Sequence, residues 1–162
     1  VTTRGIEMEL TGQLAPGWNT TLGGTYYTSR DAHGVSVNTE RPRASATLFT
    51  TYRLPGAWNR LTLGGGANWQ ISTYSKVELD EGSVIAKQKA YAIFNLMARY
   101  DFSAHLSAQL NVNNLFDKKA STVPNGPDGL PIDGGAVLDA PVTFTPYGIN
   151  GGYWYGKVGF KF

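Results

Sequence analysis

Hydrophobic and polar residues alternate one by one along seven segments of the chain. The segments are residues 4–14, 18–28, 43–54, 61–71, 92–102, 106–116 and 154–162. In the first of them, the apolar residues Ile6, Met8 and Leu10 occupy even-numbered positions (one parity), and Glu7 and Glu9 occupy the odd-numbered positions between them. Successive side chains of a β-strand point to opposite faces, so this period of two predicts seven strands, each with an apolar and a polar face.

The connections between these segments alternate between short and long. Tight turns rich in Pro and Gly join the first two segments and the third and fourth, and Ser103-Ala104-His105 joins the fifth and sixth. Long polar stretches follow the second segment, the fourth (from Ser72 through Gly82) and the sixth (residues 118–151). The pattern predicts an all-β, antiparallel, up-and-down sheet with every short turn at one end. Outer-membrane barrels have this asymmetry, with short periplasmic turns and long extracellular loops.

Charged residues are confined to one of the two predicted faces. Counted from Ile6 in the first segment, the apolar face carries none, whereas the polar face carries Glu7, Glu9, Arg43, Arg53, Arg99, Asp101, Lys157 and Lys161. A soluble β-sandwich also alternates. Strands of this length exceed the usual globular ~5–6 residues but fit a tilted membrane span. Aromatic residues near both strand ends also indicate two membrane girdles. We expect part of a transmembrane barrel. A soluble or surface β-sheet module that binds carbohydrate through Tyr and Trp remains the alternative.

Composition narrows the chemistry. The chain has 162 residues, 41% of them hydrophobic and 16% charged, a net charge of +2 and no cysteine. These values exclude a disordered tail and disulfides, and without a basic run they argue against a nucleic-acid partner. No run of ~18 apolar residues predicts a membrane-spanning helix. His33 and His105 are far apart and lack converging partners, so we expect neither a catalytic nor a metal site and no enzyme activity.

Two stretches superficially suggest ligand sites. Residues 64–69 (GGGANW) look like a phosphate cradle but lie within an alternating strand, where small residues ease packing or curvature. Asp128, Asp133 and Asp139 could offer carboxylates to calcium, but they lack the spacing of an EF-hand. We interpret that stretch as a solvated, turn-rich loop, and we expect no cofactor.

Four stretches resemble, in the same order, the barrel of TonB-dependent ferric-siderophore receptors. They are RGIEMELTGQLAPGWNTTLGGTYYTSRD (residues 4–31), TTYRLPGAWNRLTLGGGANWQ (50–70), LNVNNLFDKKA (110–120) and YGKVGFKF (155–162). The second resembles receptors for pyoverdine and for hydroxamate siderophores such as coprogen. The last resembles the aromatic-ended final strand that outer-membrane proteins present to the barrel-assembly machinery.

The resemblance implies a 22-stranded barrel around an amino-terminal plug, of which residues 1–162 would be the carboxy-terminal part, with the last seven strands and no plug. The start at Val1, without Met, suggests a piece of a longer protein. The implied location is the bacterial outer membrane. The implied partners are a ferric siderophore, outer-membrane lipid, the assembly machinery and, through the missing amino-terminal region, the TonB complex. Iron would enter only as cargo. A small passive pore is a further alternative.

The resemblance also directs attention to the polar face at the long-loop end, where siderophore pockets of this family lie. The substrate-binding candidates there are Tyr27, Arg43, Tyr91, Tyr153 and Tyr155. Tyrosine rings can pack against a chelate, and an arginine can attract an anionic complex. The alternative is that these residues pack against a plug or against each other.

Overall fold

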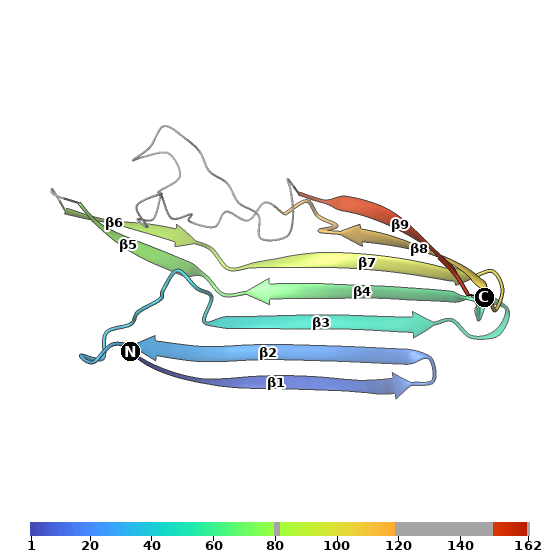
Figure 1. Ribbon diagram of the computed structural model, residues 1–162, viewed down its shortest axis with the longest axis horizontal. Coiled ribbons are helices and arrows are strands. Elements are labelled where there is room, and N and C mark those ends of the chain that lie inside the picture. The colour runs from blue at the N-terminus through green and yellow to red at the C-terminus, as the bar shows by residue number, and fades with distance from the viewer. Residues whose placement is uncertain (80–81, 119–150, 162) are drawn as a thin grey trace.

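The computed structural model describes residues 1–79, 82–118 and 151–161, most of which lie in one antiparallel sheet (Figure 1). Its strands are β1 (Thr2–Ala15), β2 (Trp18–Arg30), β3 (Ala44–Arg53), β4 (Leu61–Gln70), β7 (Tyr91–Asp101), β8 (Leu106–Asn113) and β9 (Tyr153–Phe160). The strands pair in that order as a seven-stranded sheet. The seven segments, the antiparallel pairing and the up-and-down connectivity that alternation predicts are confirmed.

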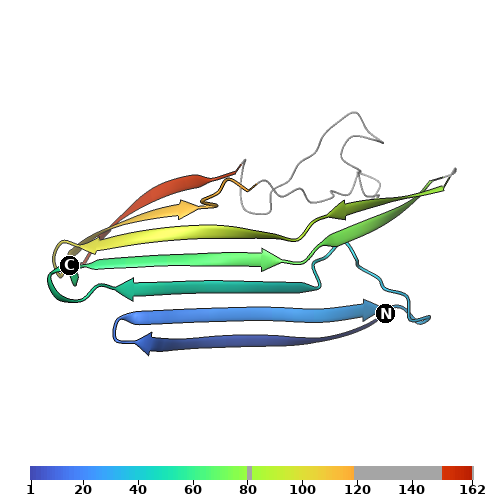
Figure 2. The same ribbon diagram turned by 180° about the vertical axis from the view of Figure 1, so that it is seen from behind.

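The connection between β4 and β7 differs from its prediction. Instead of a polar loop from Ser72 through Gly82, the chain forms a two-stranded hairpin of β5 (Thr73–Leu79) and β6 (Gly82–Gln88). Figures 1 and 2 show this hairpin continuing past the ends of β4 and β7. The backbone amide of Tyr74 donates to the carbonyl of Thr39 at 3.0 Å, so the hairpin is tied to the β2–β3 connection. Backbone pairing alone can build such a ribbon, without a continuous apolar stripe.

All the short connections gather at one end of the sheet, as predicted (Figure 1). Gly17, with φ of 79°, closes the β1–β2 turn, and a Cβ there would lie 2.9 Å from the carbonyl oxygen of Arg53. The β3–β4 connection contains a 3-10 helix, η1 (Gly56–Trp58). In the β7–β8 turn, the Ser103 hydroxyl accepts from the amides of His105 and Leu106. These local bonds replace the ladder partners that the backbone loses where it reverses.

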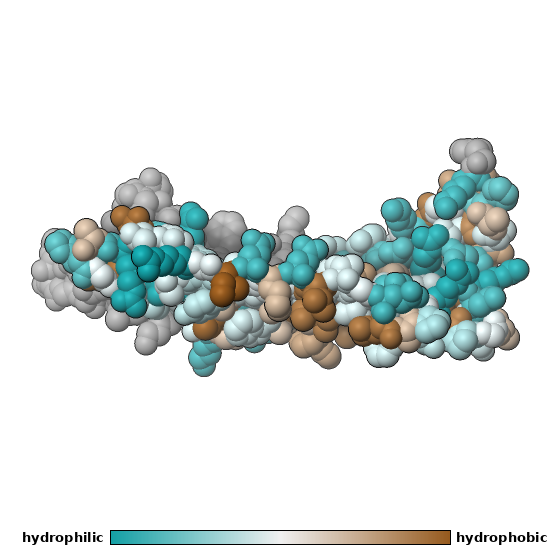
Figure 3. Space-filling model, turned by 90° about the horizontal axis from the view of Figure 1, so that it is seen from below, coloured by the Kyte–Doolittle hydropathy of each residue, from teal (hydrophilic) through white to brown (hydrophobic). Residues whose placement is uncertain are grey.

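The sheet buries almost none of its apolar side chains. Among the described residues, the buried hydrophobic ones are Tyr91 and Ile93, both on the polar face. On the apolar face, Ile6 is 74% exposed and Val158 is 74% exposed. A soluble sandwich would cover this face with a second layer. Figure 3 shows hydrophobic residues midway along the strands and hydrophilic ones toward both ends, which matches an apolar band between two wet rims.

Threonines on the apolar face find partners within the sheet. The Thr50 hydroxyl donates to the carbonyl of Asn19 at 3.0 Å, lies 2.9 Å from the Thr20 hydroxyl and accepts from Trp18 Nε1 at 2.7 Å. An unpaired polar group in an apolar medium costs several kcal/mol, roughly. This network allows polar side chains to share the face with Leu48 and Leu22.

The loop end of β8 also departs from prediction. The strand ends at Asn113, two residues before Leu115, because Asn114 takes φ of 52° and turns the chain. Phe116 therefore lies beyond the strand, although its ring still packs edge-to-face on Phe94 at 5.5 Å. In the part of the chain that the structure describes, no helix has the length and hydropathy needed to cross a membrane.

Candidate functional site

The five candidate residues lie on the polar face toward the long-loop end, but on three separated parts of the sheet. Tyr27 is on β2 and Arg43 precedes β3; Tyr91 begins β7; Tyr153 and Tyr155 are on the edge strand β9. Since the sheet order places β4 between β3 and β7, and β8 between β7 and β9, the candidates form a discontinuous band. The structure therefore brings them together as two pairs, Tyr27 with Arg43 and Tyr153 with Tyr155, and leaves Tyr91 apart.

Tyr153 and Tyr155 form the most exposed of these pairs. Their rings stack with centroids 6.3 Å apart and planes 23° from parallel. They are 49% and 48% exposed, so both rings offer free surface. Across the ladder they pair with Asn113 and Asn111 of β8. The buried Nδ2 atoms of these two asparagines have no acceptor among the described residues. The arrangement combines aromatic surface with unused amide donors.

Tyr27 and Arg43 are joined through the backbone, with the Tyr27 amide donating to the Arg43 carbonyl at 2.9 Å. The Arg43 guanidinium is directed to the β2–β3 connection, where it donates to the Ser36 hydroxyl at 3.3 Å and to the Val37 carbonyl at 3.2 Å. The Arg43 guanidinium therefore stabilises the β2–β3 connection through two hydrogen bonds. Its side chain is half-buried, and no carboxylate among the described residues pairs with it.

Tyr91 is 6% exposed and packs with Ile93. Its register partner Gln70 pairs in turn with Ser45, and Ser45 with Thr25, so a row of polar positions leads from Tyr91 across the sheet. In this structure the Tyr91 ring offers little free surface. It is better placed to shape the floor of a site than to cover a ligand.

The NNLFDK motif holds the loop ends of β7, β8 and β9 together. Asn114 donates from Nδ2 to the Lys118 carbonyl at 3.0 Å, and its Oδ1 accepts from the Lys118 amide at 2.9 Å. Its own amide donates to Oδ1 of Asn95 on β7 at 2.9 Å. Asp117 Oδ1 accepts from the Gly152 amide at 2.8 Å, just before β9. The motif therefore positions the strand that carries Tyr153 and Tyr155.

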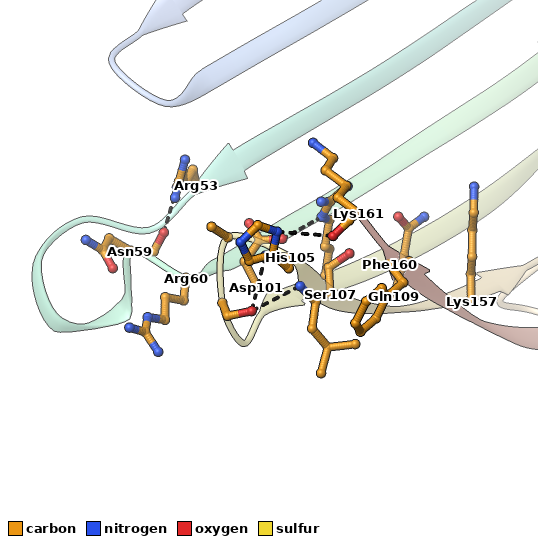
Figure 4. A pocket seen from close by; sticks show the side chains of 15 residues that line it. Arg53, Asn59, Arg60, Asp101, His105, Ser107, Gln109, Lys157, Phe160 and Lys161 are labelled. Atoms are coloured by element: carbon orange, nitrogen blue, oxygen red, sulfur yellow. Dashed lines mark hydrogen bonds and ion pairs between the residues drawn. The ribbon is translucent and has the colours of Figure 1, made fainter.

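A hollow of about 580 Å³ lies at the opposite, short-turn end of the sheet (Figure 4). Its lining includes Arg53, Arg99, Lys157 and Lys161, together with one carboxylate, Asp101. Asp101 pairs with Arg99 at 2.9 Å. The charged residues were visible in the sequence, but their convergence was not. The alternation places each on the polar face without showing that the register aligns them.

The two histidines are unremarkable members of turns. The backbone amide of His33 donates to Oδ1 of Asp31, and His105 Nδ1 lies 3.1 Å from the carbonyl oxygen of Lys161. Among the described residues there is no group of three His, Asp or Glu residues placed to hold a metal ion. The suggested calcium ligands Asp128, Asp133 and Asp139 lie outside the described residues.

Sequence and structure comparisons identify the family. The family described as TonB dependent receptor-like, beta-barrel matches residues 1–115. The ferric-pyoverdine BN7/BN8 receptor of Pseudomonas putida is 48% identical over 118 residues, which cover 73% of this chain and 14% of the relative. The ferripyoverdine receptor of Pseudomonas aeruginosa is 43% identical over 118 residues, 72% of this chain and 14% of the relative.

A solved structure gives the same result in three dimensions. The pyoverdine outer-membrane receptor of Pseudomonas aeruginosa, bound to pyoverdine, superposes with a TM-score of 0.77 at 33% identity. The superposition covers 99% of this chain and 21% of the receptor. The chain belongs to the TonB-dependent receptor family and forms part of a barrel in the bacterial outer membrane. This is a family of receptors and not of enzymes. The chain spans about one seventh of the length of the two curated relatives.

Proposed function

We propose that the receptor containing these residues binds a ferric siderophore of the pyoverdine type and imports it across the outer membrane. The observation that carries the proposal is the 48% identity to a ferric-pyoverdine receptor over most of the described sheet. Under this proposal iron is cargo within the chelate, and the barrel contributes no catalysis and holds no cofactor. We also propose that residues 1–162 belong to a single unit of the receptor, its barrel.

The energy for import would come from the TonB complex, through receptor segments outside residues 1–162. The exposed apolar face would contact outer-membrane lipid, because no element among the described residues covers it. The aromatic residues of β9 would serve recognition by the barrel-assembly machinery. The described sheet is open, with β1 and β9 at its two edges. In a membrane-spanning barrel these edges would pair with strands outside the described sheet.

Within the proposed site, Tyr153 and Tyr155 are the residues best placed to touch the chelate. Their stacked rings are half-exposed and stand beside amide donors that lack acceptors among the described residues. Tyr27 and Tyr91 would shape the neighbouring wall. Arg43 would hold the β2–β3 connection and add positive charge toward an anionic complex.

The experiment that tests this proposal replaces neighbouring residues on the two faces of β9. In the full-length receptor, we expect Tyr153→Ala to weaken ferric-pyoverdine binding about tenfold, because an aromatic contact and its buried area are lost. Trp154→Ala is the matched control. Trp154 is 73% exposed on the opposite face, and its loss should leave affinity within about twofold.

Binding would be measured on whole cells with radiolabelled ferric pyoverdine, after surface expression of each variant is equalised. Tyr153→Phe should retain most of the affinity if the ring face makes the contact. Unchanged affinity in Tyr153→Ala and Tyr155→Ala would remove this pair from the site. Absence of any ferric-pyoverdine binding by the unmodified receptor would reject the proposed cargo itself.

A further inference from the structure

Two arginines lie on the apolar face at its long-loop end. Arg4 on β1 has the same parity as Ile6, and the register places it opposite Thr28 of β2. Arg30, the last residue of β2, lies opposite Thr2. Residues that lie opposite one another in a ladder share a face, so these four polar residues form a block beyond the apolar part of the sheet. We call Thr2, Arg4, Thr28 and Arg30 the arginine block.

The two positive charges of the arginine block are not neutralised. Both arginines are exposed, and no carboxylate among the described residues lies within ion-pair distance of either. Arg30 Nη1 donates to the carbonyl of Gly34 at 3.3 Å, which uses one of the five N–H donors of its guanidinium. Oδ1 of Asp31, the next residue, accepts instead from the backbone amides of His33 and Val35. The block therefore has charge and hydrogen-bond donors to offer an anion.

The spacing of the two arginines suits a single anion. Arg4 and Arg30 are diagonal neighbours in the ladder, so their Cα atoms lie ~7–8 Å apart. Two long side chains at that separation can reach one group between them. A guanidinium binds phosphate through two parallel N–H···O bonds. A phosphate monoester carries about two negative charges and three acceptor oxygens, which matches two guanidinium groups.

The face that continues from the arginine block is apolar. Ile6, Met8 and Leu10 follow Arg4 along β1, and all three are exposed. A strand advances ~3.3 Å per residue and tilts by ~40° in membrane barrels, so the six residues from Arg4 to Leu10 descend about 15 Å. This is half of the ~30 Å hydrocarbon core, which is the depth of one leaflet. A molecule that covers both parts needs an anionic head and an apolar tail of that length.

We propose that the arginine block binds the phosphate monoester of a lipid in the outer leaflet, with the acyl chains of this lipid along Ile6, Met8 and Leu10. Figure 1 shows the start of β1 and the end of β2 at the end opposite the short turns, which is the extracellular end in outer-membrane barrels. A free phosphate ion would leave the apolar residues uncovered. The proposal rests on the contact of the apolar face with outer-membrane lipid that is proposed above.

The test places a photoreactive benzophenone amino acid at Tyr26 of the full-length receptor. Tyr26 is exposed and lies opposite Ile6, next to the arginine block. The receptor is put into nanodiscs of phosphatidylcholine that contain a small fraction of diphosphoryl lipid A, which carries phosphate monoesters. After irradiation, intact-protein mass spectrometry gives the ratio of lipid A adduct to phosphatidylcholine adduct. We expect this ratio to exceed that of the two lipids in the nanodisc about tenfold, because charge-assisted hydrogen bonds hold the monoester.

Two double variants locate the selection. Arg4→Gln with Arg30→Gln removes both charges of the block, so the adduct ratio should fall to that of the nanodisc. Arg53→Gln with Lys157→Gln is the matched control, because it also removes two charges but from the polar face at the short-turn end (Figure 4). The control should leave the ratio unchanged. Continued phosphatidylcholine adducts show that each variant is folded in the bilayer.

Three outcomes would overturn the proposal. The first is an unchanged ratio in the Arg4→Gln, Arg30→Gln variant. The second is equal enrichment of fully dephosphorylated lipid A, which would mean that the acyl chains alone select the lipid. The third is displacement of lipid A by an equal concentration of inorganic phosphate, which would show a site for soluble anions.

The phosphatidylcholine adduct separates this proposal from the one on which it rests. Phosphatidylcholine adducts without enrichment of lipid A would overturn the phosphate site alone. The absence of any lipid adduct at Tyr26 would overturn the lipid contact of the apolar face as well. No siderophore enters these measurements, so the proposed import is tested separately.

Discussion

The two faces of the sheet treat polar groups in opposite ways. On the apolar face, polar side chains are rare, and the Thr50 hydroxyl is satisfied within the sheet by Trp18, Thr20 and Asn19. On the polar face, charges and amides are left with unused capacity, as at Lys157 and Asn111. A face in lipid must satisfy its own hydrogen bonds, whereas a face toward water or another part of the receptor can leave groups for partners. The contrast therefore separates an apolar face that suits lipid from a polar face whose groups remain available to partners.

The largest expected effect tests the apolar face directly. Leu48 lies mid-strand on that face between Leu22 and Ala67, and Leu48→Arg should cost about 2–4 kcal/mol of unfolding free energy in a bilayer. Thr47→Arg is the matched control, since Thr47 is exposed on the polar face, and it should cost less than ~1 kcal/mol. Urea titration of the full-length receptor in lipid measures both. Equal costs for the two variants would mean that the faces do not differ in their surroundings.

The two hydrogen bonds between Asn114 and Lys118, which we call the loop-end clasp, should give the next largest effect. Asn114→Ala removes two hydrogen bonds to Lys118 and places alanine at φ of 52°, for an expected loss of about 2–3 kcal/mol of local stability. Lys118→Ala is the control, because the bonds of Lys118 to Asn114 come from its backbone. Hydrogen exchange at Gly152 and the start of β9 reports the loss. Unaltered protection there would show that the clasp does not hold β9.

The smallest effect concerns a substitution that hydrophobicity alone would favour. Thr50→Val on the apolar face removes the acceptor of Trp18 Nε1 and should destabilise the barrel by about 1–2 kcal/mol. Thr51→Val on the polar face should be close to neutral, because the Thr51 hydroxyl has no partner in the described ranges of the chain. The same urea titration compares the two. A stabilising Thr50→Val would show that the network contributes nothing in lipid.

The hairpin β5–β6 shows where pattern reading fails. Alternation reports a difference between two environments, and it is strong in the seven strands whose apolar face is exposed. The hairpin continues beyond the sheet (Figure 2), where pairing depends on backbone hydrogen bonds that any sequence can make. The end of β8 differs from its prediction for a separate reason. Phe116 continues the alternation of the strand, but the backbone has already turned at Asn114.

The candidate site was predictable only as a set of faces and ends. Parity placed Tyr27, Arg43, Tyr91, Tyr153 and Tyr155 on the polar face near the long loops, and the structure agrees with that placement. Parity did not reveal that Tyr91 is buried or that the Arg43 guanidinium donates hydrogen bonds to Ser36 and Val37. Whether these residues touch a siderophore stays a prediction.

The sequence by itself determined which side chains share a face, because parity along a strand is a local property of the backbone. It also determined the order of strands and the end at which the short turns gather. Only the tertiary structure decided which residues lie opposite one another across strands. Arg53, Arg99 and Lys157 are far apart in the chain, and a shift of a single residue in any one of four pairings would break their row. Register is set by contacts between distant segments, so this row of three cations exists only in the folded sheet.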